Sequence, residues 1–212
     1  MKILHHLDQR PTFLCVSTIE PRKRQDQILD AIEQLWCQNT DINLVFVGQQ
    51  GWKTELLAKR SRTHPKVGRR LFWLQGISDE YLEKVYAASS CLVAASLNEG
   101  FGLSLIEAAY HDLPIIARDI PIFREVAGNH AYYFHGESPS DLANAINAWL
   151  LLYKVSRHPE SKGMPWLTWE RSAEKLKLAL IQNYQRRQLL VDISELVSSM
   201  QRPVSSASCV RY

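Results

Sequence analysis

The stretch CLVAASLNEGFGLSLIEAAYHDLPIIARD, residues 91–119, holds a strand, a loop with two glycines, a helix and a second strand. Short apolar runs at 91–96 and 114–119 predict two buried strands. The longer apolar segment that starts near Gly102 predicts a helix between them. Strands that are joined through a helix lie parallel to each other in one sheet. This stretch therefore predicts an α/β fold built on a parallel sheet.

The same alternation of strands and helices continues on both sides of this stretch. Further strands are predicted at residues 12–19, 43–48, 71–75 and 131–134. The segments between them carry apolar residues three or four positions apart, as in helices that cover a sheet. Six such units predict a Rossmann-like, doubly wound parallel sheet of about six strands, in which the first and fourth strands lie side by side.

The pattern also divides the chain. Residues 11–187 are expected to form the domain, after a leader at 1–10, with a last helix at about 170–187. The apolar run at 189–197 predicts one more strand, and the serine-rich end is expected to be disordered. We therefore expect residues 188–212 to be a flexible tail or the start of a truncated further module.

The composition suits one globular domain, since 46% of the 212 residues are hydrophobic and 22% are charged. The sequence has no apolar run of about 18 residues and no signal-peptide pattern at its start, so a cytoplasmic protein is expected, either free or peripheral at the inner face of a membrane. Cys15 and Cys91 lie in predicted strands as buried thiols, and neither disulfides nor zinc are expected. The net charge of +3 is too small to indicate nucleic acid, and the basic clusters at 22–24 and 66–70 are most simply solvated surfaces.

Two loops carry most of the chemistry. The loops STIEPRKR (17–24) and SLNEGFG (96–102) follow the first and fourth strands, so they face each other across the crevice where such folds bind ligands. Gly100 and Gly102 leave the backbone open to a ligand, and the helix that follows offers unpaired amides. These features predict a diphosphate site. The alternative is that the glycines only turn the chain.

Cations from the first loop face the same place. Pro21 stiffens the turn, and Lys23 places a point charge toward the phosphates. Arg22 is a second candidate. Both Arg22 and Arg24 are also explained as solvated neighbours, which is the preferred interpretation for Arg24.

Two acids flank the predicted phosphate site. Glu99 precedes the glycines, and Glu107 lies about a turn and a half into the helix. Glu107 is too far along the helix to touch the phosphates and suits a ribose diol, whereas Glu99 suits a sugar hydroxyl. The competing explanation is that each acid forms an internal salt bridge or cap.

Missing motifs exclude two other classes of nucleotide-binding protein. The sequence has neither a GxGxxG after its first strand nor a GxxxxGK[ST] segment, which argues against dinucleotide oxidoreductases and P-loop NTPases. Its seven histidines show no HxxxH spacing and are expected to be surface or core residues.

Five segments, in this order and spacing, carry a resemblance to a known family: VSTIEPRKR (16–24), LVFVGQQGW (44–52), LFWLQGISDEYLEKVYAAS (71–89), EGFGLSLIEAA (99–109) and PIIARDIPIFREVAG (114–128). Over about residues 11–187 the chain resembles the C-terminal, donor-binding half of a retaining GT-B glycosyltransferase of family 4. The resemblance is strongest to the bacterial mannosyltransferases of O-antigen and polysaccharide assembly. Glu99 and Glu107 match the paired-glutamate signature of that family.

The resemblance implies a role for each candidate residue. It places Glu99 on the donor sugar and Glu107 on the ribose, and it makes Glu99 and Lys23 the catalytic residues. The residues implied in diphosphate binding are Lys23 and the amides of Gly100, Phe101, Gly102 and Leu103, with Thr18 and Arg22 as further donor-binding candidates. The base would lie near Gly76 and Ile77, after the third strand.

The chain also departs from the family pattern. Ser17 replaces a usual glycine, and Thr18 stands where many members have a phosphate-binding arginine, which is expected to weaken phosphate binding. Ser104 replaces a frequent proline and is tolerated at a helix start. A GT-B enzyme also needs an N-terminal acceptor domain, whereas the first strand here begins near residue 12. We therefore expect a fragment or remnant of a larger transferase.

The activity implied by the resemblance is transfer of a hexose with retention of configuration. The first choice of donor is GDP-mannose, with no metal or other cofactor. The partners would be a nucleotide-sugar and a glycan or lipid-linked glycan acceptor, held by the missing N-terminal domain or by a partner chain. The alternatives are a sugar-nucleotide epimerase of the same architecture and a non-catalytic or remnant nucleotide-sugar-binding module.

Overall fold

The computed structural model describes residues 3–200, with side chains for residues 3–187. Its contacts divide the chain into two compact units, Met1–Pro165 and Trp166–Tyr212. The expected domain boundary at residue 187 falls inside the second unit, within the long helix α8 (Trp169–Met200). The first compact unit therefore ends before the boundary that the sequence pattern suggested.

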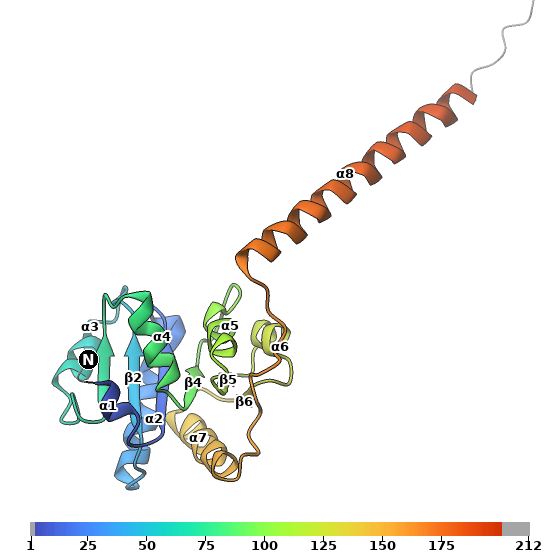
Figure 1. Cartoon of the computed structure of the whole chain (residues 1–212). Coiled ribbons are helices and arrows are strands. Elements are labelled where there is room, and N and C mark those ends of the chain that lie inside the picture. Colours follow the sequence, from blue (N-terminus) through green and yellow to red (C-terminus); the bar gives the residue numbers. More distant parts are fainter. Residues whose placement is uncertain (1–2, 201–212) are drawn as a thin grey trace, which may run out of the picture. The chain divides into compact units, whose positions relative to one another are not determined.

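The first unit contains a six-stranded sheet in the order β3-β2-β1-β4-β5-β6, in which every pair is parallel (Figure 1). The strands are β1 (Thr12–Val16), β2 (Asn43–Val47), β3 (Leu71–Leu74), β4 (Cys91–Ala94), β5 (Ile115–Arg118) and β6 (Tyr132–Phe134). β1 lies beside β4, with Phe13 paired to Cys91. The six predicted strands, their parallel direction and the switch point between the first and fourth strands are confirmed.

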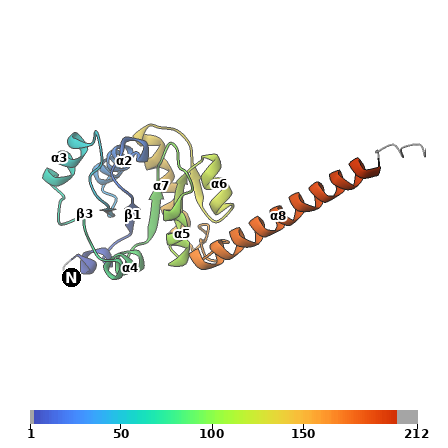
Figure 2. The ribbon, with the colours of Figure 1, turned by 90° about the horizontal axis from the view of Figure 1, so that it is seen from above.

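Seven helices of the first unit surround the sheet. They are α1 (Leu4–Leu7), α2 (Gln25–Cys37), α3 (Glu55–Thr63), α4 (Asp79–Ala87), α5 (Leu103–Tyr110), α6 (Pro121–Ala127) and α7 (Pro139–Lys154). Figure 2 shows α2 and α7 on one face of the sheet and α4 and α5 on the other. A parallel sheet needs this cover on both faces, because its strands are apolar on both sides.

Successive residues of β1 pack in two separate cores, because side chains alternate between the two faces of a sheet along a strand. Phe13 and Cys15 pack in a core with α2 and α7, which includes Trp149. Leu14 packs in a second core with α4, α5 and α6, which includes Phe123. Cys15 and Cys91 are buried, as predicted.

The described part of the expected leader, residues 3–10, contains α1 and packs on the domain. Leu7 is buried in the second core, and its carbonyl accepts a hydrogen bond of 3.0 Å from the Thr12 hydroxyl. The Asn43 side-chain amide donates to the carbonyl of His6 over 2.9 Å. These contacts hold the segment near the points where β1 and β2 begin.

The second unit contains α8, a helix of 32 residues. The strand predicted at 189–197 is wrong, because this stretch continues the helix. No glycine or proline interrupts the sequence between Trp169 and Met200, so nothing local ends the helix. A strand would also need a neighbouring strand for its backbone hydrogen bonds, whereas a helix satisfies them internally. The rest of the predicted tail, residues 201–212, lies outside the described residues.

Among the described helices, none combines the length and the apolar character needed to cross a bilayer.

Candidate functional site

A cavity of about 400 Å³ lies at the carboxyl ends of β1 and β4, the two strands at the switch point. Its lining residues are Val16, Ser17, Thr18, Glu20, Arg22, Lys23, Glu99, Phe101, Gly102, Leu103, Ser104 and Glu107. The amide of Leu97 donates to the carbonyl of Arg22 over 2.8 Å, which joins the two loops directly. The expectation that these loops face each other is therefore met.

The loop after β1 is held by a side chain that the sequence analysis did not select. Pro21 opens a short 3₁₀ turn (Pro21–Lys23), and Arg24 ends it in a left-handed conformation with φ of 55°. The buried Gln25 side chain donates to the Ser17 hydroxyl over 2.8 Å and to the Thr18 carbonyl over 3.0 Å. Gln25 and Gln27 are the polar residues on the buried face of α2, and a glutamine on that face was the signal available for this role.

Glu99 is held on several sides inside the cavity. One carboxylate oxygen accepts hydrogen bonds from the Lys23 ammonium and, over 2.7 Å, from the Ser96 hydroxyl. The other oxygen accepts from Arg22 over 3.1 Å. Burial acts to raise the pKa of Glu99, but the bonds from Lys23, Ser96 and Arg22 outweigh it and hold the pKa below its usual value. Glu99 is thus ionised and fixed in position at neutral pH.

Glu107 is held more simply. It is exposed on α5, and its carboxylate accepts a hydrogen bond of 2.7 Å from the hydroxyl of Tyr86 on α4. Burial, together with the nearby carboxylate, raises the pKa of Tyr86 far above its usual value, so the phenol stays a donor. The Tyr86 ring also stacks on His111, with centroids 4.7 Å apart. The sequence analysis did not select Tyr86, and no local pattern gave a sign of this bond.

Each competing explanation for the two acids is therefore partly correct. Glu99 does form a salt bridge, and Glu107 does have an internal partner. Both acids nevertheless line the same cavity. Internal partners on one side and an open cavity on the other are what a fixed ligand-binding carboxylate requires.

The two glycines of the second loop differ. Gly102 has φ of 90° and begins α5, and a Cβ there would lie 3.1 Å from the Phe123 ring, so the turn itself requires glycine. Gly100 does not have a positive φ, and a Cβ there would meet no atom within 4 Å. The protein's own packing therefore explains Gly102 but not Gly100.

Three predicted site residues do not line the cavity. Gly100 is exposed beside it. Gly76 and Ile77 follow β3, which is separated from β1 by β2. The sheet places their loop at the same edge as the cavity, because all strands are parallel, but two strands further along.

Arg24 is not the solvated neighbour that we expected. Its guanidinium bonds the Glu137 carboxylate over 2.8 Å and pairs with Asp26 over 3.3 Å, and its side chain is only 18% exposed. The cation links the start of α2 to the segment before α7, so it supports the domain and does not face the cavity.

Arg118 is a buried cation that the sequence analysis missed. Its guanidinium donates to the carbonyl of Ala95 over 2.9 Å and also bonds the carbonyl of Gly136 and the side chain of Gln27. Because Ala95 follows β4, these bonds fix the start of the loop that carries Glu99. No local pattern marks an arginine in a strand for this role.

Within the described part of the chain, no group of three or more His, Cys, Asp or Glu side chains is arranged to hold a metal ion.

The fold and the cavity define a class of protein: a doubly wound α/β domain with acids and cations around a helix start at its switch point. Residues 1–164 match the family of glycosyl transferases group 1, and the chain belongs to that family.

The chain is similar in sequence to the serotype-specific mannosyltransferase WbdA of Escherichia coli. The two are 52% identical over 166 residues, which is 78% of this chain but only 20% of that protein. The chain therefore spans about a fifth of the length of this relative.

Solved structures share the fold at low sequence identity. Sucrose-phosphate synthase from Thermosynechococcus elongatus is 22% identical, with a TM-score of 0.68 over 84% of this chain and 47% of that one. The C-terminal domain of the group 1 family protein LpcC from Francisella tularensis is 18% identical, with a TM-score of 0.61 over 74% of this chain and 87% of that one. The Rossmann-like domain expected for one half of a GT-B architecture is thus confirmed.

Proposed function

We propose that this chain is the donor-binding half of a retaining hexosyltransferase that uses a nucleotide-sugar, with GDP-mannose as first choice. The observation that carries the proposal is one cavity at the switch point that brings together Glu99, Glu107 and Lys23 around the start of α5. The mannose assignment draws on relatives that are named mannosyltransferases.

In the proposed complex the diphosphate lies at the start of α5. The amides of residues 100–103 and the positive end of the helix dipole bind it there. Lys23 and Arg22 already share Glu99 as a partner, so they are preorganised beside the phosphates. Thr18 supplies only a hydroxyl to this side of the cavity, and its exposed position suits a weak polar contact.

In the proposed complex the two acids bind opposite ends of the donor. Glu107, oriented by Tyr86, accepts hydrogen bonds from the ribose diol, and the base extends toward Gly76 and Ile77. Glu99 accepts from hydroxyl groups of the sugar. This division follows from their positions, because the helix start lies between the two carboxylates along the chain.

The reaction breaks the bond between the anomeric carbon and the diphosphate and forms a bond from that carbon to an acceptor oxygen on the same face. The acceptor hydroxyl gives its proton to the departing phosphate. Lys23 and the α5 dipole stabilise the charge that develops on the leaving diphosphate. No metal takes part in this scheme.

The acceptor is a glycan or a lipid-linked glycan, bound by an N-terminal domain or a partner chain. The chain covers about a fifth of the length of WbdA, so a whole protein of that length would have room for such a domain. In this proposal the whole transferase works in the cytoplasm or at the inner face of the membrane, where a lipid-linked acceptor would lie.

A non-catalytic binding module is the second candidate, favoured by Thr18 at the position where many family members carry an arginine. A transfer assay with added acceptor domains separates it from an enzyme subunit, because both candidates bind the donor but only the enzyme subunit transfers the sugar.

The test compares GDP-mannose with GDP by calorimetry, in the parent chain and in two variants. Glu107→Gln should weaken both ligands, because both contain the ribose. Glu99→Gln should lower the ratio of donor affinity to GDP affinity, because only the donor contains the sugar. EDTA should not change the affinity of either variant for GDP-mannose or for GDP.

UDP-, ADP- and dTDP-sugars serve as donor controls, and Glu125→Gln, an exposed acid outside the cavity, serves as a variant control. The proposal fails if none of the nucleotide-sugars binds. The roles given to the acids are wrong if Glu99→Gln weakens GDP as much as GDP-mannose.

A further inference from the structure

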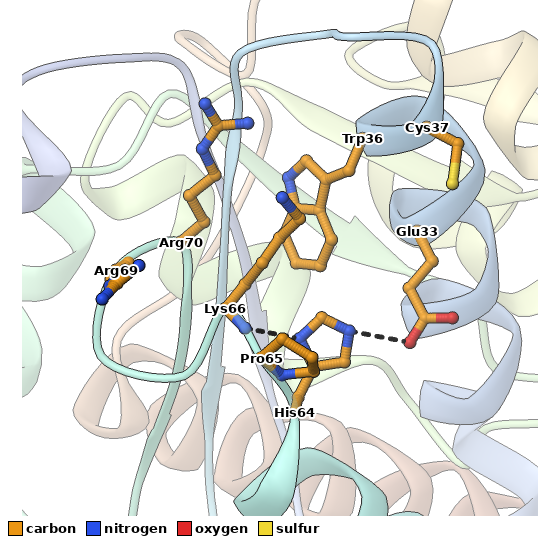
Figure 3. A pocket seen from close by; sticks show the side chains of 8 residues that line it. All are labelled: Glu33, Trp36, Cys37, His64, Pro65, Lys66, Arg69 and Arg70. Carbon is orange, nitrogen blue, oxygen red and sulfur yellow. Dashed lines mark hydrogen bonds and ion pairs between the residues drawn. The ribbon is translucent and has the colours of Figure 1, made fainter.

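A second cavity, of about 630 Å³, lies between the end of α2 and the segment from His64 to β3 (Figure 3). Its lining residues are Glu33, Trp36, Cys37, His64, Pro65, Lys66, Arg69 and Arg70. α2 ends, and β3 begins, at the edge of the sheet where the strands start, whereas the donor cavity lies where they end. The two cavities therefore sit at opposite edges of the same sheet.

The acid in this second cavity, Glu33, has a hydrogen-bond partner on each carboxylate oxygen. Glu33 accepts a hydrogen bond from Arg60 through one carboxylate oxygen, and His64 Nε2 lies 3.1 Å from the other. His64 Nδ1 accepts the backbone amide of Lys66 over 3.0 Å, so Nε2 carries the proton and donates to Glu33. The carboxylate thus has a partner on each of its two oxygens.

The cations around the cavity are in excess. Arg60 contacts Asp30 over 2.5 Å as well as Glu33, and Arg70 and Arg10 share Asp41 at 2.9 Å and 3.0 Å. The cationic side chains of this cluster are Arg10, Arg60, Lys66, Arg69 and Arg70, and the carboxylates are Asp30, Glu33 and Asp41. Lys66 and Arg69 have no carboxylate partner among the described residues.

The Trp36 indole gives the cavity a rigid wall. Its N–H donates to the carbonyl of Ile42 over 2.9 Å, and its ring is only 5% exposed. Figure 3 shows the Lys66 side chain running alongside this ring, with the ammonium 5.5 Å from the ring centroid. The sequence analysis treated residues 66–70 as solvated surface, but Lys66 and Arg70 are half-buried in this cavity.

From this arrangement we propose that the cavity binds a phosphate group, at a site separate from the donor cavity. Lys66 and Arg69, which lack carboxylate partners among the described residues, line this cavity together with Arg70 and offer many donors and positive charge to an anion there, while both oxygens of Glu33 are already hydrogen-bonded. A phosphate, with several acceptor oxygens and more than one negative charge, uses this set more fully than a carboxylate does. The source is either a small phosphate compound or the headgroup of an anionic lipid.

The first measurement localises binding in the full chain by ¹⁵N–¹H NMR. Inorganic phosphate is titrated at constant ionic strength, with sodium chloride as the blank. We expect saturating shifts of the amides of residues 64–70 and of the Trp36 indole. Shifts at residues 17–24 and 99–104 report the donor cavity separately, so a failure of the proposed function does not affect this result.

Two double variants test the assignment. Lys66→Gln with Arg69→Gln should lower phosphate affinity at residues 64–70 by at least about tenfold, since two charge-assisted contacts are lost. The matched control, Lys59→Gln with Lys84→Gln, removes two exposed lysines outside the cavity and should change the affinity by less than about twofold. Because Lys66 and Arg69 lack ion-pair partners in the described chain, their variant should remain folded and lose no more stability than the contact of Lys66 with the Trp36 ring contributes.

Sedimentation with phosphatidylcholine vesicles, with and without phosphatidylglycerol, distinguishes the two sources. If the parent binds the anionic vesicles and the Lys66/Arg69 variant does not, the ligand is a lipid headgroup. If phosphate gives saturating shifts but the protein does not sediment with the vesicles, the ligand is a small molecule. The proposal is overturned if neither is seen, or if the control variant loses as much binding as the cavity variant.

Discussion

At the scale of single residues, the hydroxyl of Tyr86 is the group that orients Glu107. Tyr86→Phe removes this hydrogen bond but keeps the ring that stacks on His111. We expect it to weaken GDP and GDP-mannose by the same factor, up to about tenfold, because a hydrogen bond to a charged group is lost. Calorimetry with both ligands measures the factor.

Tyr132→Phe is the matched control, because the Tyr132 hydroxyl has no hydrogen-bond partner in the described part of the chain. It should leave both affinities unchanged. A Tyr86→Phe variant that loses stability but keeps its nucleotide affinity would show that Tyr86 is only a packing residue.

Glu99 gives the domain a predictable response to acid. Its folded pKa is held below the usual value of 4.5, mainly because the bonds from Lys23, Ser96 and Arg22 outweigh the effect of burial. A lowered folded pKa adds stability above the unfolded pKa, and that stability is lost as the pH falls through the folded value. The parent should therefore exceed Glu99→Gln in melting temperature at neutral pH by a margin that shrinks below about pH 4.5.

Scanning calorimetry of the parent and of Glu99→Gln between neutral and acid pH measures this difference in melting temperature. The other carboxylates are the same in both proteins, so their effect cancels in the comparison. A difference in melting temperature that stays constant across the whole range would mean that the ion pair of Glu99 adds nothing to folding.

At the scale of elements, we expect the two glycines in the loop before α5 to affect folding and ligand binding differently. Gly102→Ala places a Cβ at φ of 90° and 3.1 Å from Phe123, and should destabilise the domain by about 1–3 kcal/mol. Gly100→Ala places its Cβ in open space without a positive φ, and should stay within about 0.5 kcal/mol of the parent. Urea unfolding measures both values.

The Gly100→Ala variant also tests the proposed diphosphate site. Gly100→Ala should weaken GDP although it leaves stability unchanged, because a methyl group would crowd a ligand at the start of α5. If Gly100→Ala binds GDP like the parent, the ligand does not approach the backbone at that residue.

At the scale of the whole molecule, we expect the doubly wound domain to fold without α8. The first compact unit ends at Pro165, and the family match ends at residue 164. A chain shortened to residues 1–165 should unfold cooperatively, with the melting temperature and GDP affinity of the parent. Circular dichroism and calorimetry check this, and a non-cooperative transition would show that residues after 165 contribute to the domain's core.

The sequence by itself determined the sheet and the two loops that line the candidate site. Strands and covering helices have local patterns, and the switch point follows from the order of the units, so loops 17–24 and 96–102 could be paired before any coordinates. Glu99, Lys23 and Glu107 were selected because they lie around the predicted phosphate site, and the resemblance to the glycosyltransferase family implied a role for each.

Only the tertiary structure decided which groups hold these residues and what the remaining charges do. Tyr86, Gln25 and Arg118 act through bonds to residues distant in sequence or on other elements, and no local pattern encodes such pairs. The stretch at 189–197 became helix because a strand depends on a neighbour elsewhere in the chain, whereas a helix depends only on itself. The cavity around Trp36 and Lys66 likewise exists only because the end of α2 packs beside the segment before β3, far from it in sequence.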